Sequence, residues 1–404
     1  MVNKFHISFL GRVFSSALSF FIFIFLAKNL SIDVFGMYSL SLAYAAIVTL
    51  IGFSIIKRSV VRLSSISDIY LSNLYTLAVY ISSFLSVLLM IFHIFGFDDF
   101  YLTVLFLAIS IGLFDVQQEV NIYYEKHLAF NLNLIFRSAL IFLFIFAISI
   151  DDRSNIYQVL IVISVSYLII ALVNMIRFRA LFSKVVSKEN LIYIVKFGFP
   201  LALSTGMVYV VDFFDRFYIS KFLGSKDVGI YSGLYNLAQQ VVGVIMIALY
   251  TYFWPKLAKT YEKPIYFKQT IYEYYQVFFA FSITMILISY FFHDFIVNNV
   301  LGFEFSQYSY ILFLIVLSIV ISCAKAYCID IFFLLRNQTK FVFGISFVSA
   351  LINVILNITL IPSYGLTGAA YSTLLTFLLS FFISCFFATK FKKKINDNDI
   401  NSNI

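Results

Sequence analysis

FFDRFYISKFLGSKDVGIY, residues 213–231, follows an apolar run that begins at residue 199. The run could lie in hydrocarbon as far as Phe214, but Asp215 and Arg216 then stand side by side among aromatic residues. Insertion of an ionisable residue at the centre of a bilayer costs about 2.5–3.5 kcal/mol, so such a charge needs a partner or a function. What this pair does therefore depends on where the membrane spans lie.

The composition indicates a membrane protein. Of 404 residues, 62% are hydrophobic and 12% are charged, whereas soluble domains carry about 25% charged residues. A crossing helix needs about 20 mainly apolar residues. On this basis the sequence predicts an all-α integral membrane protein with twelve transmembrane helices, at residues 9–30, 38–56, 71–95, 101–124, 131–150, 156–178, 197–221, 228–254, 270–292, 308–335, 340–361 and 365–389.

The charges of the connecting segments predict an orientation. Lys and Arg favour cytoplasmic loops. With both termini in the cytoplasm, 22 of the 28 Lys and Arg residues fall in inner segments and four in outer ones. The net charge of +8 then faces the anionic lipid of the inner surface, and no feature favours nucleic acid as a partner. The first span has no small-residue cleavage site, so we expect it to be retained.

Two weak sequence echoes predict an internal repeat. AKNLSIDVFGMYS at 27–39 and SKFLGSKDVGIYS at 220–232 share five residue types in register, and SAL recurs at 138–140 and 349–351. Both echoes fall at equivalent places of two six-span halves. We therefore expect two six-helix bundles related by a pseudo-twofold axis along the membrane normal. The expected organisation is an N-terminal bundle at 1–178, a cytoplasmic linker at 179–196, a C-terminal bundle at 197–390 and a polar cytoplasmic tail at 391–404.

Enzymatic and metal chemistry are not expected. The three cysteines have no CxxC spacing and the four histidines are scattered, which argues against a metal site or a cofactor. No Gly-rich nucleotide-binding loop appears, so ATP hydrolysis is excluded. The loops are too short for a catalytic domain.

Several segments carry a family resemblance. FFDRFYISKFLGSKDVGIYSGLYNLAQ at 213–239 resembles the seventh-to-eighth span signature of bacterial polysaccharide flippases, the Wzx-type O-antigen transporters. FGFPLALS at 197–204, FGMYSLSLAY at 35–44 and YGLTGAAYSTLL at 364–375 are similar to other spans of that family. The resemblance covers nearly the whole chain. It implies a MATE-like fold, shared with the multidrug and toxic-compound extruders.

The resemblance also implies a substrate and partners. The substrate would be an undecaprenyl-pyrophosphate-linked oligosaccharide, moved from the inner to the outer leaflet of the bacterial cytoplasmic membrane for O-antigen or lipopolysaccharide synthesis. A polysaccharide polymerase and a chain-length regulator would be its partners. The alternative is a cation-coupled multidrug or metabolite exporter of the same fold.

Charged and aromatic residues inside the spans are the candidate substrate contacts. A pyrophosphate head needs cations in a wet cleft, and sugars stack on aromatic rings. Asp212 and Arg216 are four apart, so we expect Asp212, not Asp215, to be the partner of Arg216. Lys325 is deep in its span, and Asp330 five positions on is a poor same-face partner for a helix of 3.6 residues per turn. The candidate contacts are Arg216, Lys325, Arg12, Arg137, Asp212, Tyr209 and Tyr235.

Each candidate has a structural alternative. Arg216 could snorkel to the outer interface, and Lys325 could pair across helices with Asp115 or Glu119. Arg12 and Arg137 could mark the inner interface. With aromatic residues at 20% of the chain, tyrosines could serve only in packing.

Three acids are candidates for ion coupling. Asp115 and Glu119 lie four apart on one span, and like charges on one face favour proton retention by one of them. Asp330 lies 211 positions after Glu119, the offset of the second echo. Acids that line a wet inner vestibule would give the same pattern, so both interpretations stay open.

Overall fold

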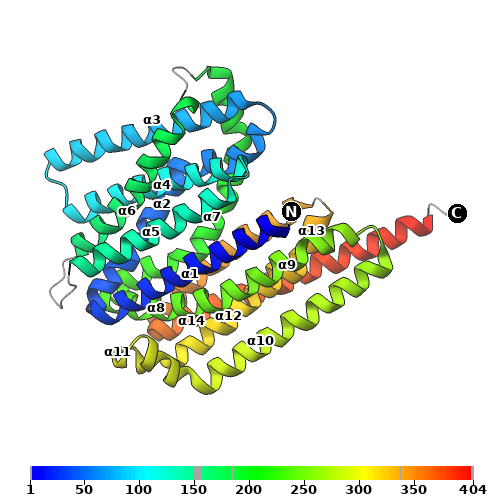
Figure 1. The fold of residues 1–404 in the computed structure, drawn as a ribbon. Helices are drawn as coiled ribbons and strands as arrows, with labels where there is room; N and C mark the ends of the chain where they lie inside the picture. The colour runs from blue at the N-terminus through cyan, green and yellow to red at the C-terminus, as the bar shows by residue number, and fades with distance from the viewer. Residues whose placement is uncertain (1, 149–155, 183–185, 337, 402–404) are drawn as a thin grey trace. The chain divides into compact units, whose positions relative to one another are not determined.

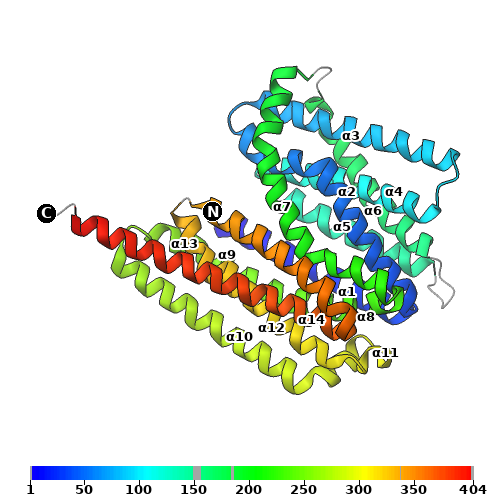
Figure 2. The ribbon, with the colours of Figure 1, turned by 180° about the vertical axis from the view of Figure 1, so that it is seen from behind.

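The chain is helical throughout the part that its computed structural model describes (Figure 1, and Figure 2 from behind). The described residues are 2–148, 156–182, 186–336 and 338–401, with side chains at residue 11 and from 14 to 390 outside these gaps. The helices are α1 (Val2–Asn29), α2 (Ile32–Ser64), α3 (Asp68–Ile94), α4 (Asp99–Tyr123), α5 (His127–Ala147), α6 (Ile156–Arg177), η1 (Arg179–Leu181), α7 (Lys188–Phe222), α8 (Ser225–Ala238), η2 (Gln239–Gly243), α9 (Val244–Thr260), α10 (Pro264–Val300), α11 (Phe303–Ser306), α12 (Ser309–Ala324), η3 (Lys325–Ile329), α13 (Asp330–Leu335) and α14 (Thr339–Asn401).

Ten helices among the described residues are long and apolar enough to cross a membrane. Two of them are composite, because α8, η2 and α9 form one span and α12, η3 and α13 another. The described apolar part of α1, Phe14–Asn29, is shorter, and α14 is two helices merged across a kink. The kink is at Gly365, whose φ of 59° lies in the left-handed region that favours glycine. The protein is thus a multi-pass membrane protein with ten to twelve crossing helices.

Short polar signals mark the helix ends. The Asp98 carboxylate accepts a hydrogen bond of 2.8 Å from the N–H of Phe100 and caps α4. Ser31 and Ser67 cap α2 and α3 in the same way. Such side chains satisfy backbone donors that a helix leaves free at its N-terminus. Gly224, with φ of 102°, makes the turn between α7 and α8.

The chain divides into two compact units, Met1–Tyr209 and Val210–Ile404. In the first unit α4 is the central helix, in contact with α2, α3, α5 and α6, and 61% of its most apolar window is buried. The most apolar window of α3 is only 11% buried. Both views show α3 at the edge of its unit (Figures 1 and 2). The exposed surface of α3 is therefore suited to lipid.

The second unit repeats this pattern. The span made by α12, η3 and α13 contacts α10 and α14, and α12 also contacts α8. Its most apolar window is again 61% buried, whereas that of α10, at the edge of the unit, is 17% buried. Each unit thus has a covered fourth span and an exposed third span in chain order.

The division falls inside α7, which begins earlier than the sequence suggested. Residues 188–196, assigned to the linker, are the first turns of α7. The residues of α7 that follow pack closely against α2 in the first unit. A Cβ added to Gly198 would lie only 2.7 Å from side-chain atoms of Ile55 and Ser59. The predicted domain boundaries at residues 178 and 197 stay a prediction.

Candidate functional site

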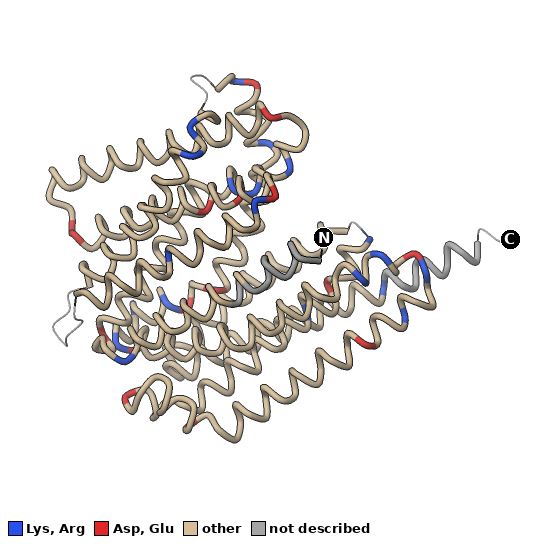
Figure 3. Tube along the Cα trace, in the orientation of Figure 1, with Lys and Arg blue, Asp and Glu red and all other residues tan. Residues whose placement is uncertain are grey.

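Charges within the spans are few, and Figure 3 shows most of the described charge toward the helix ends. In the first unit Lys57 of α2 and Asp115 of α4 form an ion pair with an Nζ–Oδ2 distance of 2.6 Å. The two helices come close one turn earlier, where a Cβ on Gly112 would collide with the ring of Phe53. Residues three and four apart share a helix face, so this close approach also brings Lys57 to Asp115.

Two further groups join this ion pair. Glu119, one turn along α4, and Tyr209 on α7 both interact electrostatically with Lys57. About a third of each partner's side chain stays exposed, 31% for Lys57 and 32% for Asp115. The structure therefore gathers three predicted site residues, Asp115, Glu119 and Tyr209, around one lysine.

Sequence reasoning missed Lys57 because it was counted as a loop cation after a span ending at residue 56. The signal was present, since the apolar pattern continues after Arg58 and α2 runs to Ser64.

Arg137 of α5 is a cation among hydroxyl groups. Its guanidinium donates to Tyr167 Oη at 3.2 Å, to Ser19 Oγ at 3.3 Å and to Ser138 Oγ at 3.0 Å. Its Cζ lies 5.8 Å from the ring centroid of Phe114 and 5.1 Å from that of Tyr167. No acid forms an ion pair with it among the described side chains, and its buried Nε has no hydrogen-bond acceptor there. Its charge is thus not paired with a carboxylate among the described side chains.

In the second unit Lys325 and Asp330 form an ion pair with an Nζ–Oδ2 distance of 2.7 Å. The expectation that Asp330 is a poor partner was wrong, because residues 325–329 form the π-helix η3. A π-helix repeats at i to i+5, which brings Asp330 onto the face of Lys325. Ser384 of α14 donates a further hydrogen bond to Asp330. The charge of Lys325 is therefore balanced within its own span by Asp330.

Two tyrosines of α10 support this π-helix. The hydroxyl of Tyr274 donates to the carbonyl of Tyr327 at 3.0 Å, and that of Tyr275 donates to the carbonyl of Cys328 at 2.8 Å. A π turn changes the register of helical hydrogen bonds, so its carbonyls need other donors. These tyrosines stabilise the segment that sets the Lys325–Asp330 pair.

Arg216, in the stretch at residues 213–231, is buried, with 4% of its surface exposed. It does not snorkel. Its guanidinium donates to the backbone carbonyl of Asp212 at 2.9 Å, to Ser232 Oγ at 3.1 Å and to Asn236 Oδ1 at 3.4 Å. The Asp215 carboxylate accepts the backbone N–H of Arg216 at 2.7 Å.

Asp212 is thus the partner of Arg216 through its carbonyl, not through the expected carboxylate ion pair. No carboxylate lies within 4.0 Å of the guanidinium among the described residues. Both nearby carboxylates still attract it electrostatically. Arg216 therefore ties α7 to α8.

Aromatic rings complete this junction. The Cζ of Arg216 lies 5.0 Å from the ring centroid of Phe213 and 5.2 Å from that of Tyr235. Tyr235 is 6% exposed, and its neighbour Tyr231 is fully buried with its hydroxyl 3.1 Å from Thr373 Oγ1. In this conformation Tyr235 packs on an arginine instead of offering a face to a sugar.

Arg12 adds nothing to the described site geometry, and no metal site is described. Arg12 lies on α1, but its side chain falls outside the described part. Among the described residues no group of three His, Cys, Asp or Glu side chains could hold a metal ion.

Comparisons with known proteins give the family and the fold. The family described as "Polysaccharide biosynthesis protein" matches residues 1–261. No curated protein matches the chain by sequence. Among solved structures, the lipid II flippase MurJ in an inward closed conformation is similar over 95% of this chain and 87% of that one, with a TM-score of 0.76 and 14% identity.

Other similar structures belong to MATE transporters. An inward-facing multidrug resistance MATE transporter of the MOP superfamily aligns over 94% of this chain and 96% of that one, with a TM-score of 0.63 and 12% identity. The Vibrio cholerae MATE transporter VcmN aligns over 97% and 96%, with a TM-score of 0.59 and 13% identity. At such identities the likeness concerns the fold, and it confirms the expected MATE-like architecture. Because the family match spans more than half of the sequence, the chain belongs to the polysaccharide biosynthesis protein family, and its fold is similar to the folds of MurJ and of MATE transporters.

Proposed function

We propose that the protein is a flippase for undecaprenyl-pyrophosphate-linked oligosaccharides. It would move repeat units of O-antigen or a similar surface polysaccharide from the inner to the outer leaflet of the bacterial cytoplasmic membrane by alternating access. The observation that carries the proposal is the combination of a polysaccharide biosynthesis family match with a fold also seen in a lipid II flippase. The finer architecture belongs to the same proposal: twelve spans in two pseudo-twofold-related six-helix bundles, with both termini cytoplasmic.

Arg137 is the cation best suited to the pyrophosphate. A charge held by hydroxyls and aromatic faces, without an acid, keeps its attraction for a phosphate oxygen. A guanidinium also matches phosphate through its planar fork of donors. Arg12 is a second candidate on the neighbouring helix of this unit. Arg216 and Lys325 are satisfied within the second unit, so we assign them to the conformation of that unit.

Lys57, Asp115 and Glu119 are our candidates for ion coupling. Two acids and one lysine leave one negative charge that a proton or a sodium ion could balance. In proteoliposomes, Asp115→Asn/Glu119→Gln should abolish the response of transport to an imposed ion gradient. Glu262→Gln, at an exposed acid, is the control. A full response in the double variant would remove these acids from coupling.

Deletion of the gene in its own host tests the proposed function. We expect complete lipid-linked repeat units to accumulate at the inner leaflet, and the polymer made by the partner polymerase and chain-length regulator to disappear from the surface. Complementation with the wild-type gene should restore it. Unchanged surface polysaccharide, in a strain without a redundant flippase, would refute the proposal.

A second candidate is a cation-coupled exporter of drugs or metabolites. The acids near Lys57 and the likeness to MATE folds favour it. It predicts that deletion sensitises the host to cationic compounds and leaves the surface polysaccharide intact, so the same strain separates the two functions.

A further inference from the structure

A basic pocket lies in the first unit, away from the groups described so far. It is at the turn between α4 and α5, against the end of α6, and has a volume of about 450 Å³. Lys126 and Arg177 supply its charge, while Leu128 and Leu132 of α5 supply apolar wall. Neither cation contacts Arg137 or the Lys57 group in any ion pair or hydrogen bond of the described residues.

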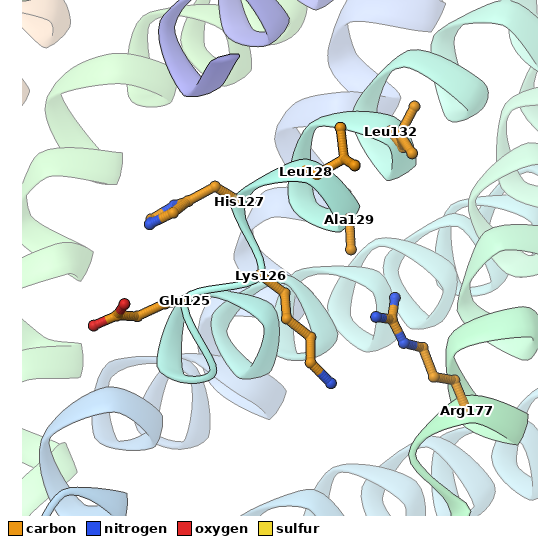
Figure 4. Close-up of a pocket in the computed structure, with 7 residues that line it drawn as sticks. All are labelled: Glu125, Lys126, His127, Leu128, Ala129, Leu132 and Arg177. Atoms are coloured by element: carbon orange, nitrogen blue, oxygen red, sulfur yellow. The ribbon is translucent and has the colours of Figure 1, made fainter. Parts of the chain in front are cut away.

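The two cations face the same space, and neither forms an ion pair among the described residues. Figure 4 shows the side chains of Lys126 and Arg177 extending toward one another, whereas that of Glu125 extends the other way. At this turn Glu125 has a φ of 52°. That left-handed conformation is rare for a residue with a Cβ. Glu125 and His127 also line the pocket, and the carboxylate extends away from the two cations (Figure 4).

An aromatic ring places both cations. The Nζ of Lys126 lies 5.9 Å from the ring centroid of Phe178, and the Cζ of Arg177 lies 5.7 Å from the same centroid. Tyr124 adds a second ring at 4.9 Å from Lys126 Nζ. Contacts with ring faces orient a cation but leave its full charge, so two like charges are held together at one end of the pocket.

Apolar side chains continue from the pocket along α5 and α6. Leu128 is 60% exposed, and on α6 Val173 and Ile176 are 58% and 71% exposed. The two helices are joined by a hydrogen bond of 3.3 Å from Asn133 Nδ2 to Asn174 Oδ1. A ligand that places a phosphate at the cations would therefore have hydrocarbon surface beside it.

We propose that this pocket binds the headgroup of an anionic phospholipid, with its phosphate between Lys126 and Arg177 and its acyl chains along α5 and α6. Basic pockets between membrane helices suit such headgroups. A free phosphate shares the headgroup chemistry but makes no use of the apolar surface. A zwitterionic phospholipid uses that surface, but its own cation opposes the two basic side chains.

Lipid titration of the purified full-length protein tests the proposal. Native mass spectrometry in detergent would compare dioleoylphosphatidylglycerol with dioleoylphosphatidylcholine. We expect preferential retention of phosphatidylglycerol. In Lys126→Gln/Arg177→Gln we expect a loss of affinity on the order of 30-fold, from about fivefold for each cation. Lys126→Arg/Arg177→Lys keeps both charges and should keep the preference.

A matched control removes the same charge elsewhere. Lys259→Gln/Lys268→Gln changes two exposed lysines of the second unit and should leave the preference intact. Equal retention of the two lipids by the wild type, or wild-type affinity in Lys126→Gln/Arg177→Gln, would overturn the proposal. Displacement of phosphatidylglycerol by equimolar inorganic phosphate would also overturn it and identify a free-phosphate site. The readout is binding and does not depend on what the transporter carries.

Discussion

Lys325 Nζ lies 2.7 Å from Asp330 Oδ2 although five positions separate the two residues. In an ordinary α-helix, that spacing places side chains on different faces. The π-helix at 325–329 removes this mismatch, and the pair occupies the most covered span of its unit. Only 12% of the lysine side chain and 5% of the aspartate side chain is exposed.

Breaking this pair should destabilise the protein. Removal of one partner of a buried ion pair leaves an uncompensated charge and costs about 3–5 kcal/mol. We expect Lys325→Ala and Asp330→Ala each to lower the unfolding temperature in detergent, and the double variant Lys325→Ala/Asp330→Ala to recover most of the loss. An unchanged unfolding temperature in Lys325→Ala, with transport lost, would instead make Lys325 a substrate contact.

The two supporting tyrosines should matter through their hydroxyls. Tyr274→Phe and Tyr275→Phe each leave a carbonyl of η3 without its donor, at a cost of about 1–3 kcal/mol. We expect faster hydrogen exchange at residues 325–330 in both variants. Tyr272→Phe, on the same helix but 63% exposed, is the control. Wild-type exchange rates in the double variant Tyr274→Phe/Tyr275→Phe would show that the π-helix does not need these donors.

Arg216 should not be replaceable by lysine. Its three nitrogen atoms donate to three acceptors on α7 and α8, and a single ammonium group cannot match that fork. Hydrogen bonds to a charged group contribute about 1.5–3 kcal/mol, so Arg216→Lys should lose at least that much stability, and Arg216→Ala more. Lys221→Ala, at the exposed end of α7, should be neutral. Thermal unfolding followed by fluorescence measures all three, and a stable Arg216→Lys protein would contradict the fixed geometry.

Arg137 should behave in the opposite way. Arg137 is only partly buried, whereas Arg216 is 4% exposed. Because glutamine also keeps an amide donor for the neighbouring hydroxyls, Arg137→Gln should leave the protein level and the unfolding temperature close to those of the wild type. Loss of a charged contact to the substrate phosphate, about 1.5–3 kcal/mol, predicts a transport defect of about 10- to 100-fold. The accumulation of lipid-linked repeat units in complemented deletion cells measures it. Normal surface polysaccharide in the Arg137→Gln strain would exclude Arg137 from the substrate path.

The membrane fold was predictable because each span is a continuous run of apolar residues in the sequence. Apolar runs of sufficient length, separated by charges, locate ten described spans without knowledge of any contact. The limits of the helices were less predictable, since α2 and α10 extend well beyond the apolar runs at 38–56 and 270–292. Capping residues such as Asp98 mark such ends, but they act through hydrogen bonds that hydropathy does not register.

The partners of the charged residues were much less predictable. The expected pairings assumed 3.6 residues per turn throughout, and η3 departs from that at Lys325. Two of the three hydrogen-bond acceptors of Arg216 are side chains of α8, 16 and 20 positions away in the sequence. Both are uncharged, so no charge pattern identifies them. Lys57 was set aside because it follows an apolar run, and only the close approach of α2 to α4 gives it a buried role.

The two ion pairs differ in how their charges can enter the membrane during synthesis. Lys325 and Asp330 sit in one span, so they can leave the translocation machinery together as a neutral unit. Lys57 precedes Asp115 by 58 positions and belongs to a different helix. Until α4 has been made, the lysine has no Asp115 to offset the cost of placing its charge in lipid. Assembly of the first unit therefore depends on the order and timing of helix insertion. In the second unit, the lysine and the aspartate that balances its charge enter the membrane in the same span.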